Sequence, residues 1–137
     1  MSSAVIDASV ALAWGFPDES SVYADRVYDA LDGFVIRVPA LGAIEITNAI
    51  IVAERRQRIK PAEIRQFLSL MNGLTVVLES QDLQESVNNI LPVARAHGLS
   101  AYDAAYLDVA LRHNAPLATL DDRLRAAAKA AGVNELV

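Results

Sequence analysis

The chain has 137 residues, of which 53% are hydrophobic and 21% charged, a composition that indicates one globular domain and excludes a disordered or fibrous protein. It contains no cysteine, which excludes disulfides, thiolate metal sites and thiol catalysis, and its net charge of −5 argues against broad nonspecific affinity for nucleic acid or acidic membranes. Asp7 interrupts the first apolar run, and the longest stretch without a charge, residues 66–78, is shorter than the about 20 apolar residues of a spanning helix. We therefore expect a cytoplasmic protein with no membrane segment.

Short apolar runs alternate with longer helical patterns along the chain. In the first half of the chain the patterns predict a strand over residues 4–6, a helix after Asp7, a helix over 18–31, a strand over 34–38, a helix over 41–56 and a helix from Pro61 to near Gly73. In the second half they predict a strand over 74–78, helices over 83–97 and 104–113, a strand over 116–120, a helix over 122–131 and a candidate fifth strand over 133–137. Pro92 predicts a kink or a break in its helix.

The strands show little polar alternation, which is typical of parallel strands that are covered on both faces. We therefore expect a single domain over residues 1–137 with an α/β fold. The expected architecture is a three-layer sandwich, in which helices flank a mostly parallel central sheet of four or five strands.

Several carboxylates stand in apolar surroundings. Asp7 is the only charged residue in positions 1–17, and Glu45 is the only one in positions 38–53. The others are Asp103, in the nearly apolar stretch 99–107, and Asp121 and Asp122, which follow the strand predicted over 116–120. Because an isolated buried carboxylate is costly, each of them needs a hydrogen-bond donor, a proton, a basic partner or a metal.

The predicted topology lets four of these acids meet. Asp7 and Asp121 follow parallel strands and so lie at the same carboxyl edge of the sheet, whereas Asp103 and Glu45 lie on helices. No lysine or arginine occurs in residues 1–25 or 38–54. Two like charges about 5 Å apart repel by about 3 kcal/mol at an effective dielectric of about 20. A divalent cation would relieve this repulsion, and oxygen-only ligands suit Mg²⁺ or Mn²⁺.

Each acid also has a simpler interpretation. Asp7 could cap the helix that follows it, Asp103 could be the acid of a capping box opened by Ser100, and Asp121 or Asp122 could cap the last helix. Glu45 has no capping role, because it lies inside a helix, on a stripe with apolar residues. The four acids together favour a metal site.

At this point the sequence resembles a PIN domain, and specifically a VapC-type toxin of a toxin–antitoxin pair. The resemblance covers essentially the whole chain, in four blocks: VIDASVALAW at residues 5–14, VPALGAIEITNA at 38–49, HGLSAYDAAYL at 97–107 and PLATLD at 116–121. The departures are Gly42 and Ala43, where bulkier residues are expected, and Pro92 within a helix.

The resemblance implies roles for particular residues. It assigns metal-binding and catalytic acids to Asp7, Glu45, Asp103 and Asp121, and it favours Asp121 over Asp122, which stands at a position that varies in the family. It further implies that three residues hydrogen-bond or orient these acids: Ser9, Thr119 and, for Glu45, Asn48.

The implied activity is that of an endoribonuclease toxin dependent on Mg²⁺ or Mn²⁺. Such an enzyme hydrolyses RNA phosphodiesters with a metal-activated water, which Asp103 or Asp121 would orient or deprotonate, and leaves a 5′-phosphate and a 3′-hydroxyl. The resemblance also implies a homodimer and a small antitoxin whose tail occupies the acidic cleft. The one basic cluster could be a solvated helix end or a contact with RNA or antitoxin; it consists of Arg55, Arg56, Arg58 and Lys60.

Two rival interpretations remain open, a PIN-fold nuclease that cuts DNA and a PIN-fold binding module that does not cleave. Retention of all four acids argues against the binding module. A receiver-like phosphoacceptor domain would need a lysine after a late strand, and residues 117–122 offer none. We expect the aromatic side chains to pack in the core or at an interface: Trp14, Phe16, Tyr102 and Tyr106.

Overall fold

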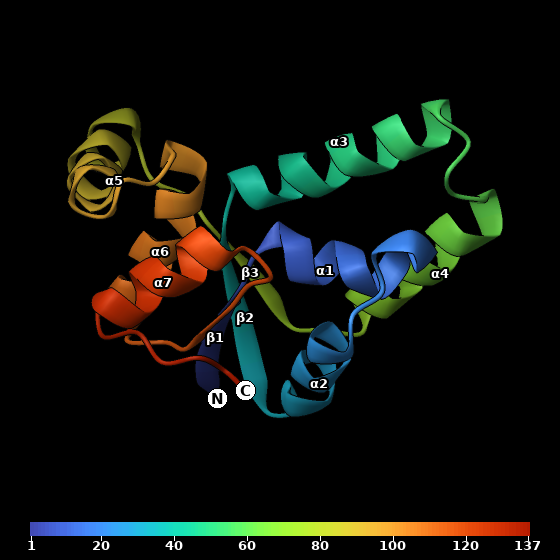
Figure 1. Cartoon of the computed structure of the whole chain (residues 1–137), viewed down its shortest axis with the longest axis horizontal. Coiled ribbons are helices and arrows are strands. Elements are labelled where there is room, and N and C mark those ends of the chain that lie inside the picture. The colour runs from blue at the N-terminus through green and yellow to red at the C-terminus, as the bar shows by residue number, and fades with distance from the viewer.

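The computed structural model describes all residues, 1–137, and contains one parallel sheet of four strands (Figure 1). The strands are β1 (Ser2–Ile6), β2 (Phe34–Pro39), β3 (Val76–Glu79) and β4 (Leu117–Ala118), in the spatial order β3-β2-β1-β4. Ser2 pairs with Phe34, Ile36 with Val76, and Val5 with Leu117. Because every pairing is parallel, the carboxyl ends of all four strands lie at one edge of the sheet.

Seven α-helices surround the sheet: α1 (Ala8–Gly15), α2 (Val22–Ala30), α3 (Leu41–Arg55), α4 (Pro61–Asn72), α5 (Leu83–His97), α6 (Ala101–His113) and α7 (Asp122–Ala130). The alternation of side chains along β1 divides them into two layers. Ala4 and Ile6 join the core that α1 and α2 cover, whereas Val5 joins the core that α6 and α7 cover. The predicted three-layer α/β sandwich is confirmed, with four strands.

The helices α3 and α4 form an arm that packs on the end of α1 (Figure 1). A separate small core holds this arm, and its buried members are Phe16, Ala53, Ile59 and Phe67. Gly15 permits the packing, because a Cβ at this position would come within 2.4 Å of Cγ of Phe67. The arm therefore fixes α3, which carries Glu45, relative to α1, which begins beside Asp7.

Some helices differ from the sequence-based expectations. The helix expected over residues 18–31 begins later, at Val22, because the hydroxyl of Ser21 caps it by accepting from the Ala24 amide at 3.2 Å. A 3₁₀ turn, Pro17–Glu19, occupies the preceding residues. The expected break at Pro92 is absent: α5 continues through it, and the carbonyl deprived of its donor belongs to the exposed Asn88, where water can bind it.

The candidate fifth strand over residues 133–137 does not form. Only an isolated parallel bridge joins Glu135 to Leu117. The chain turns sharply at Gly132, whose φ is +81°, and β4 is only two residues long, so there is little edge on which a fifth strand could pair. No helix is both long enough and apolar enough to cross a membrane.

Candidate active site

Asp7 is the centre of a hydrogen-bonded turn at the carboxyl edge of the sheet. It directly follows β1, is 5% exposed and caps α1 through Oδ1, which accepts from the Val10 amide at 3.3 Å. The same oxygen accepts from the Ser9 hydroxyl at 2.5 Å, and Oδ2 accepts from the Thr119 hydroxyl at 2.5 Å. Asp7 therefore does cap the helix, but capping occupies one oxygen and leaves the other to Thr119, which follows a strand that is distant in sequence.

The two hydroxyls also join the turn after β1 to the turn after β4. Ser9 Oγ accepts from the Leu120 amide at 3.0 Å, and Thr119 Oγ1 accepts from the Asp121 amide at 3.0 Å. Each hydroxyl thus accepts from a backbone amide while it donates to Asp7, which fixes its orientation. The contacts hold Asp7 and the segment before Asp121 in one rigid arrangement.

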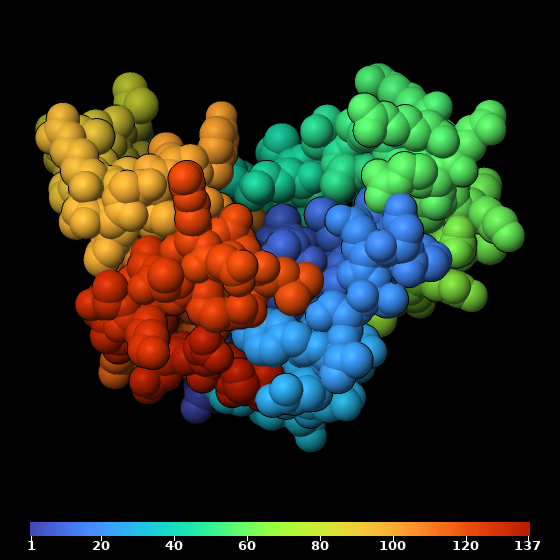
Figure 2. Space-filling model, in the orientation of Figure 1, coloured from blue at the N-terminus to red at the C-terminus, as the bar shows by residue number.

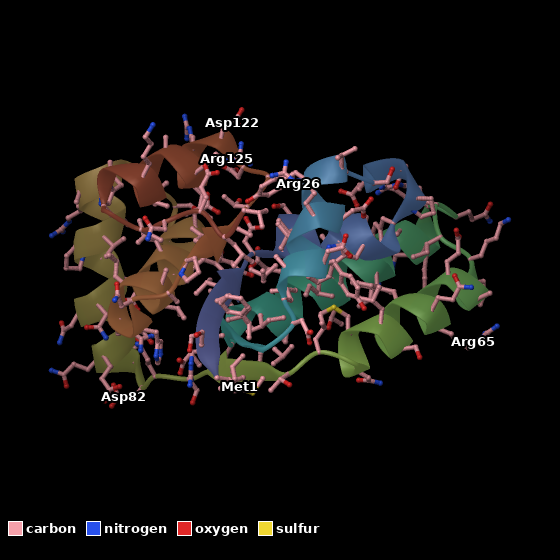
Figure 3. The ribbon with its side chains drawn as sticks, turned by 90° about the horizontal axis from the view of Figure 1, so that it is seen from below. Met1, Arg26, Arg65, Asp82, Asp122 and Arg125 are labelled. Atoms are coloured by element: carbon pink, nitrogen blue, oxygen red, sulfur yellow. The ribbon has the colours of Figure 1, made fainter.

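The neighbouring acids Asp121 and Asp122 have different surroundings. Asp121 caps α7 by accepting from the Leu124 amide at 2.9 Å, and its charge acts on Asp103. Asp122 has a side chain that is 97% exposed, lies 3.3 Å from the Arg125 guanidinium and projects outward from α7 (Figure 3). Asp121 is therefore the member of the pair that belongs to the acidic group.

Glu45 receives its hydrogen bond from a residue that the sequence analysis assigned to packing. The hydroxyl of Tyr106, on α6, donates to Oε1 of Glu45 at 2.8 Å. Asn48, the residue expected to orient Glu45, is exposed and makes no hydrogen bond to it. Tyr106 is itself 3% exposed, and burial, followed by its contact with Glu45, raises the pKa of its hydroxyl, so the hydroxyl remains a donor.

Two sequence signals point to Tyr106 in retrospect. It lies three residues after Asp103 on one helix, which places both on the same face, and Gly42 lies one turn before Glu45 on the other helix. Phe16 is buried as expected. Tyr102 is 65% exposed at the start of α6, so it does not pack in the core, and its expected place at an interface stays a prediction.

The acids influence one another electrostatically. Burial raises the pKa of Asp7 and the negative charge of Asp103 adds to this, against the lowering effect of the hydrogen bonds from Ser9, Thr119 and Val10. Burial likewise raises the pKa of Glu45, and the negative charges of Asp7 and Asp103 raise it further. These mutual effects identify a group of neighbouring like charges.

Asp103 links this group to Asp121. Its pKa is raised by burial and then by the charge of Asp121, while the Ser100 hydroxyl and the Arg123 charge act in the opposite direction. Ser100 caps α6 by accepting from the Asp103 amide at 3.2 Å, so capping does not occupy the Asp103 carboxylate. A hollow lies between the α6–α7 side of the molecule and α3, with the start of α1 at its floor (Figure 2).

The donor chemistry of this group fits a divalent cation. The four acids supply only oxygen, and none of them forms an ion pair with lysine, arginine or histidine. As they stand, no three carboxylates already surround one point closely enough to hold an ion. Like charges repel, and a cation shared by these acids would relieve the repulsion.

The basic cluster lies at the far end of α3 from the acids (Figure 1). Arg58 is already engaged, because its Nε and Nη2 donate to Oδ2 of Asp18 at 3.0 and 2.8 Å. Arg55, Arg56 and Lys60 are exposed and form no ion pair. The cluster therefore contains three cations without an ion pair and a fourth, Arg58, that is bound to Asp18 in the segment after α1.

Comparison with known proteins identifies the same fold. The sequence profile of the PIN domain family matches residues 4–130. Ribonuclease VapC3 from Pyrobaculum aerophilum is 28% identical over 120 residues, which cover 88% of this chain and 90% of the relative.

Two solved structures are similar in fold. The crystal structure of PAE2754 from Pyrobaculum aerophilum superimposes with a TM-score of 0.71 at 24% identity, over 98% of this chain and 84% of that one. A toxin–antitoxin complex from Klebsiella pneumoniae gives a TM-score of 0.53 at 17% identity, over 86% of each chain.

Proposed function

The chain belongs to the PIN domain family, and from this premise we propose that it is a divalent-metal-dependent endoribonuclease, the VapC-like toxin of a toxin–antitoxin pair. The observation that carries the proposal is the group of four acids at the carboxyl edge of the sheet, in which Asp7 is anchored by two hydroxyls. The similarity to Ribonuclease VapC3, over nearly the full length of both chains, supports RNA as the substrate.

The residues that would hold Mg²⁺ or Mn²⁺ are Asp7, Glu45, Asp103 and Asp121. When bound, such an ion supplies a water of lowered pKa and stabilises the charge that develops on the phosphate. Ser9 and Thr119 keep the Asp7 carboxylate in place for it. Asp103, whose carboxylate caps no helix, is the first candidate to orient the attacking water or take its proton, and Asp121, whose carboxylate caps α7, is the second.

The expected products are a 5′-phosphate and a 3′-hydroxyl, because a water and not the ribose 2′-hydroxyl is the nucleophile. Arg55, Arg56 and Lys60 are the free cations of the α3 end and could contact the RNA backbone or an antitoxin. The tail of the antitoxin would occupy the site of the four acids and exclude RNA.

A homodimer belongs to the same proposal. The strand β3 lies at the edge of the sheet, and three of its apolar residues are exposed: Val76, Val77 and Leu78. An exposed apolar edge strand favours pairing with another chain. Sedimentation of the purified protein would test this part of the proposal.

The direct test is cleavage of a panel of structured RNAs by purified protein with Mg²⁺, Mn²⁺ or EDTA. We expect cleavage with either metal, none with EDTA, and a loss of about 100-fold or more in an Asp7→Asn variant. Asp122→Asn is the matched control, because it removes the same charge from an exposed, outward-facing position next to Asp121. Cleavage of the corresponding DNA but not of RNA would favour the DNA nuclease, and metal-independent binding without cleavage would favour the binding module.

A further inference from the structure

Tyr106 connects α6 and α3, the two helices that carry Asp103 and Glu45. It lies on α6, 61 positions after Glu45 in sequence, and its hydroxyl makes the one hydrogen bond that the Glu45 carboxylate receives. The bond uses Oε1 and leaves Oε2 without a protein partner. A glutamate in the middle of a helix has a long, mobile side chain, and a single buried donor restricts where its carboxylate can lie.

Gly42 gives the tyrosine hydroxyl its space. It is buried on α3, one turn before Glu45, at a position where the family resemblance leads us to expect a bulkier residue. A Cβ at Gly42 would lie 2.9 Å from the Tyr106 hydroxyl oxygen, which is closer than carbon and oxygen can approach without a shift. The next nearest atoms, Cζ of Tyr106 and Cβ of Val38, are at 3.7 and 3.8 Å, which is ordinary contact.

We infer that Tyr106 is a positioning residue, whose hydroxyl holds the Glu45 carboxylate toward the other acids, and that Gly42 is a glycine because a side chain there would displace this hydroxyl. The inference rests on the proposed function, since the position of Glu45 matters to cleavage only if the acids share an ion. It assigns to Tyr106 the role that the sequence led us to expect of Asn48.

The first experiment needs neither RNA nor metal. Melting temperatures in EDTA are compared for the parent, Gly42→Ala, Tyr106→Phe and the double variant. Gly42→Ala should lower the melting temperature of the parent, because its methyl group meets the hydroxyl. In the Tyr106→Phe background the same change should leave the melting temperature unchanged or raise it, because the collision is gone and alanine is the better helix former.

The second experiment measures Mn²⁺ affinity by electron paramagnetic resonance, together with cleavage at limiting Mn²⁺. Loss of a group that orients a metal ligand typically weakens metal binding by 10- to 100-fold, so we expect the Mn²⁺ Kd of Tyr106→Phe to rise by about tenfold. At limiting Mn²⁺, kcat should fall while KM for RNA stays the same. Tyr102→Phe is the matched control, since it makes the same change at an exposed position on the same helix.

A double-mutant cycle separates positioning from a merely structural role. In a Glu45→Gln background, Tyr106→Phe should have no further effect on Mn²⁺ affinity. If the parent binds Mn²⁺ and cleaves RNA but Tyr106→Phe binds Mn²⁺ with the same affinity, the inference is overturned and the proposed function stands. The same holds if Gly42→Ala lowers stability equally in both backgrounds. A parent that binds no Mn²⁺ would overturn the proposed function, and the role of Tyr106 with it.

Discussion

The Thr119 hydroxyl lies 2.5 Å from Oδ2 of Asp7, and the two residues are 112 positions apart in sequence. This contact closes the carboxyl edge of the sheet between β1 and β4, which pair directly. It means that the most buried acid of the site depends on a residue near the end of the chain for its orientation.

Thr119→Val should therefore destabilise the protein by about 1–3 kcal/mol, the usual cost of leaving a buried polar group without its partner. Valine has the shape of threonine, but it leaves both Oδ2 of Asp7 and the Asp121 amide without this contact. Urea unfolding in EDTA measures the effect. The control is Thr47→Val, which removes an exposed hydroxyl bonded only to its own helix at Ala43, and should change stability by no more than about 0.5 kcal/mol. Equal effects would mean that the Thr119 contact does not hold Asp7.

Asp7→Asn should separate activity from stability. The amide keeps the size of the side chain and an oxygen that can cap α1, and it removes one charge from a repulsive group. We expect cleavage to fall by about 100-fold or more, beyond the range typical for residues that only orient a ligand. In EDTA the melting temperature should be equal to or higher than that of the parent. A clear drop in EDTA would instead make capping the main role of Asp7.

The raised pKa values predict how stability depends on pH without metal. Asp7, Glu45 and Asp103 have folded pKa values above the ordinary values of 3.8, 4.5 and 3.8, so the folded state binds their protons more tightly than the unfolded state. Their contribution to stability is therefore unfavourable at neutral pH, and it is removed as the pH falls through the folded pKa values toward the ordinary ones.

Urea unfolding of the parent and of Asp7→Asn at several pH values between 7 and about 4, in EDTA, isolates this contribution. The stability gained by Asp7→Asn should be largest at pH 7 and should shrink on acidification. A gain that is constant over this range would show that Asp7 titrates normally in the folded protein.

Metal binding should stabilise the folded state. A ligand that binds only the folded protein adds RT ln(1 + [L]/Kd), or about 2.7 kcal/mol at a hundredfold excess over Kd. Millimolar Mn²⁺ or Mg²⁺ should raise the melting temperature of the parent, and the rise should shrink in a Glu45→Gln/Asp121→Asn variant. Glu54→Gln/Asp122→Asn is the charge-matched control. Glu54 is an exposed residue of the helix that carries Glu45, and Asp122 is the exposed neighbour of Asp121. If both variants keep the full rise, the ion binds elsewhere.

The basic cluster should divide into residues that affect RNA binding and one that does not. Arg55→Ala and Arg56→Ala should each weaken RNA binding and reduce its salt dependence, by about 0.7 in the slope of log K against log salt for each lost contact with a single strand. Arg58→Ala should change RNA binding little, because this guanidinium is held by Asp18. Filter binding across a salt series checks both. The maximal rate should stay unchanged, since all four acids remain.

The sequence by itself determined the layers of the fold and the element on which each acid lies. Apolar strands without polar alternation predict a parallel sheet covered on both faces, and Asp7 necessarily lies at the carboxyl edge because it follows the first strand. Asp103 and Glu45 are assigned to helices by local patterns alone. These features depend on periodicity and on neighbours in the chain, which a sequence displays directly.

Only the tertiary structure decided which side chains serve the acids. The choice of Tyr106 over Asn48 as the partner of Glu45 depends on how α6 and α3 are rotated and how closely they pack at Gly42. The engagement of Arg58 by Asp18 and the outward position of Asp122 likewise depend on where the arm and α7 dock. Such contacts join residues far apart in sequence, and a hydrogen bond forms only when packing brings donor and acceptor to within about 3 Å, a condition that no local pattern contains.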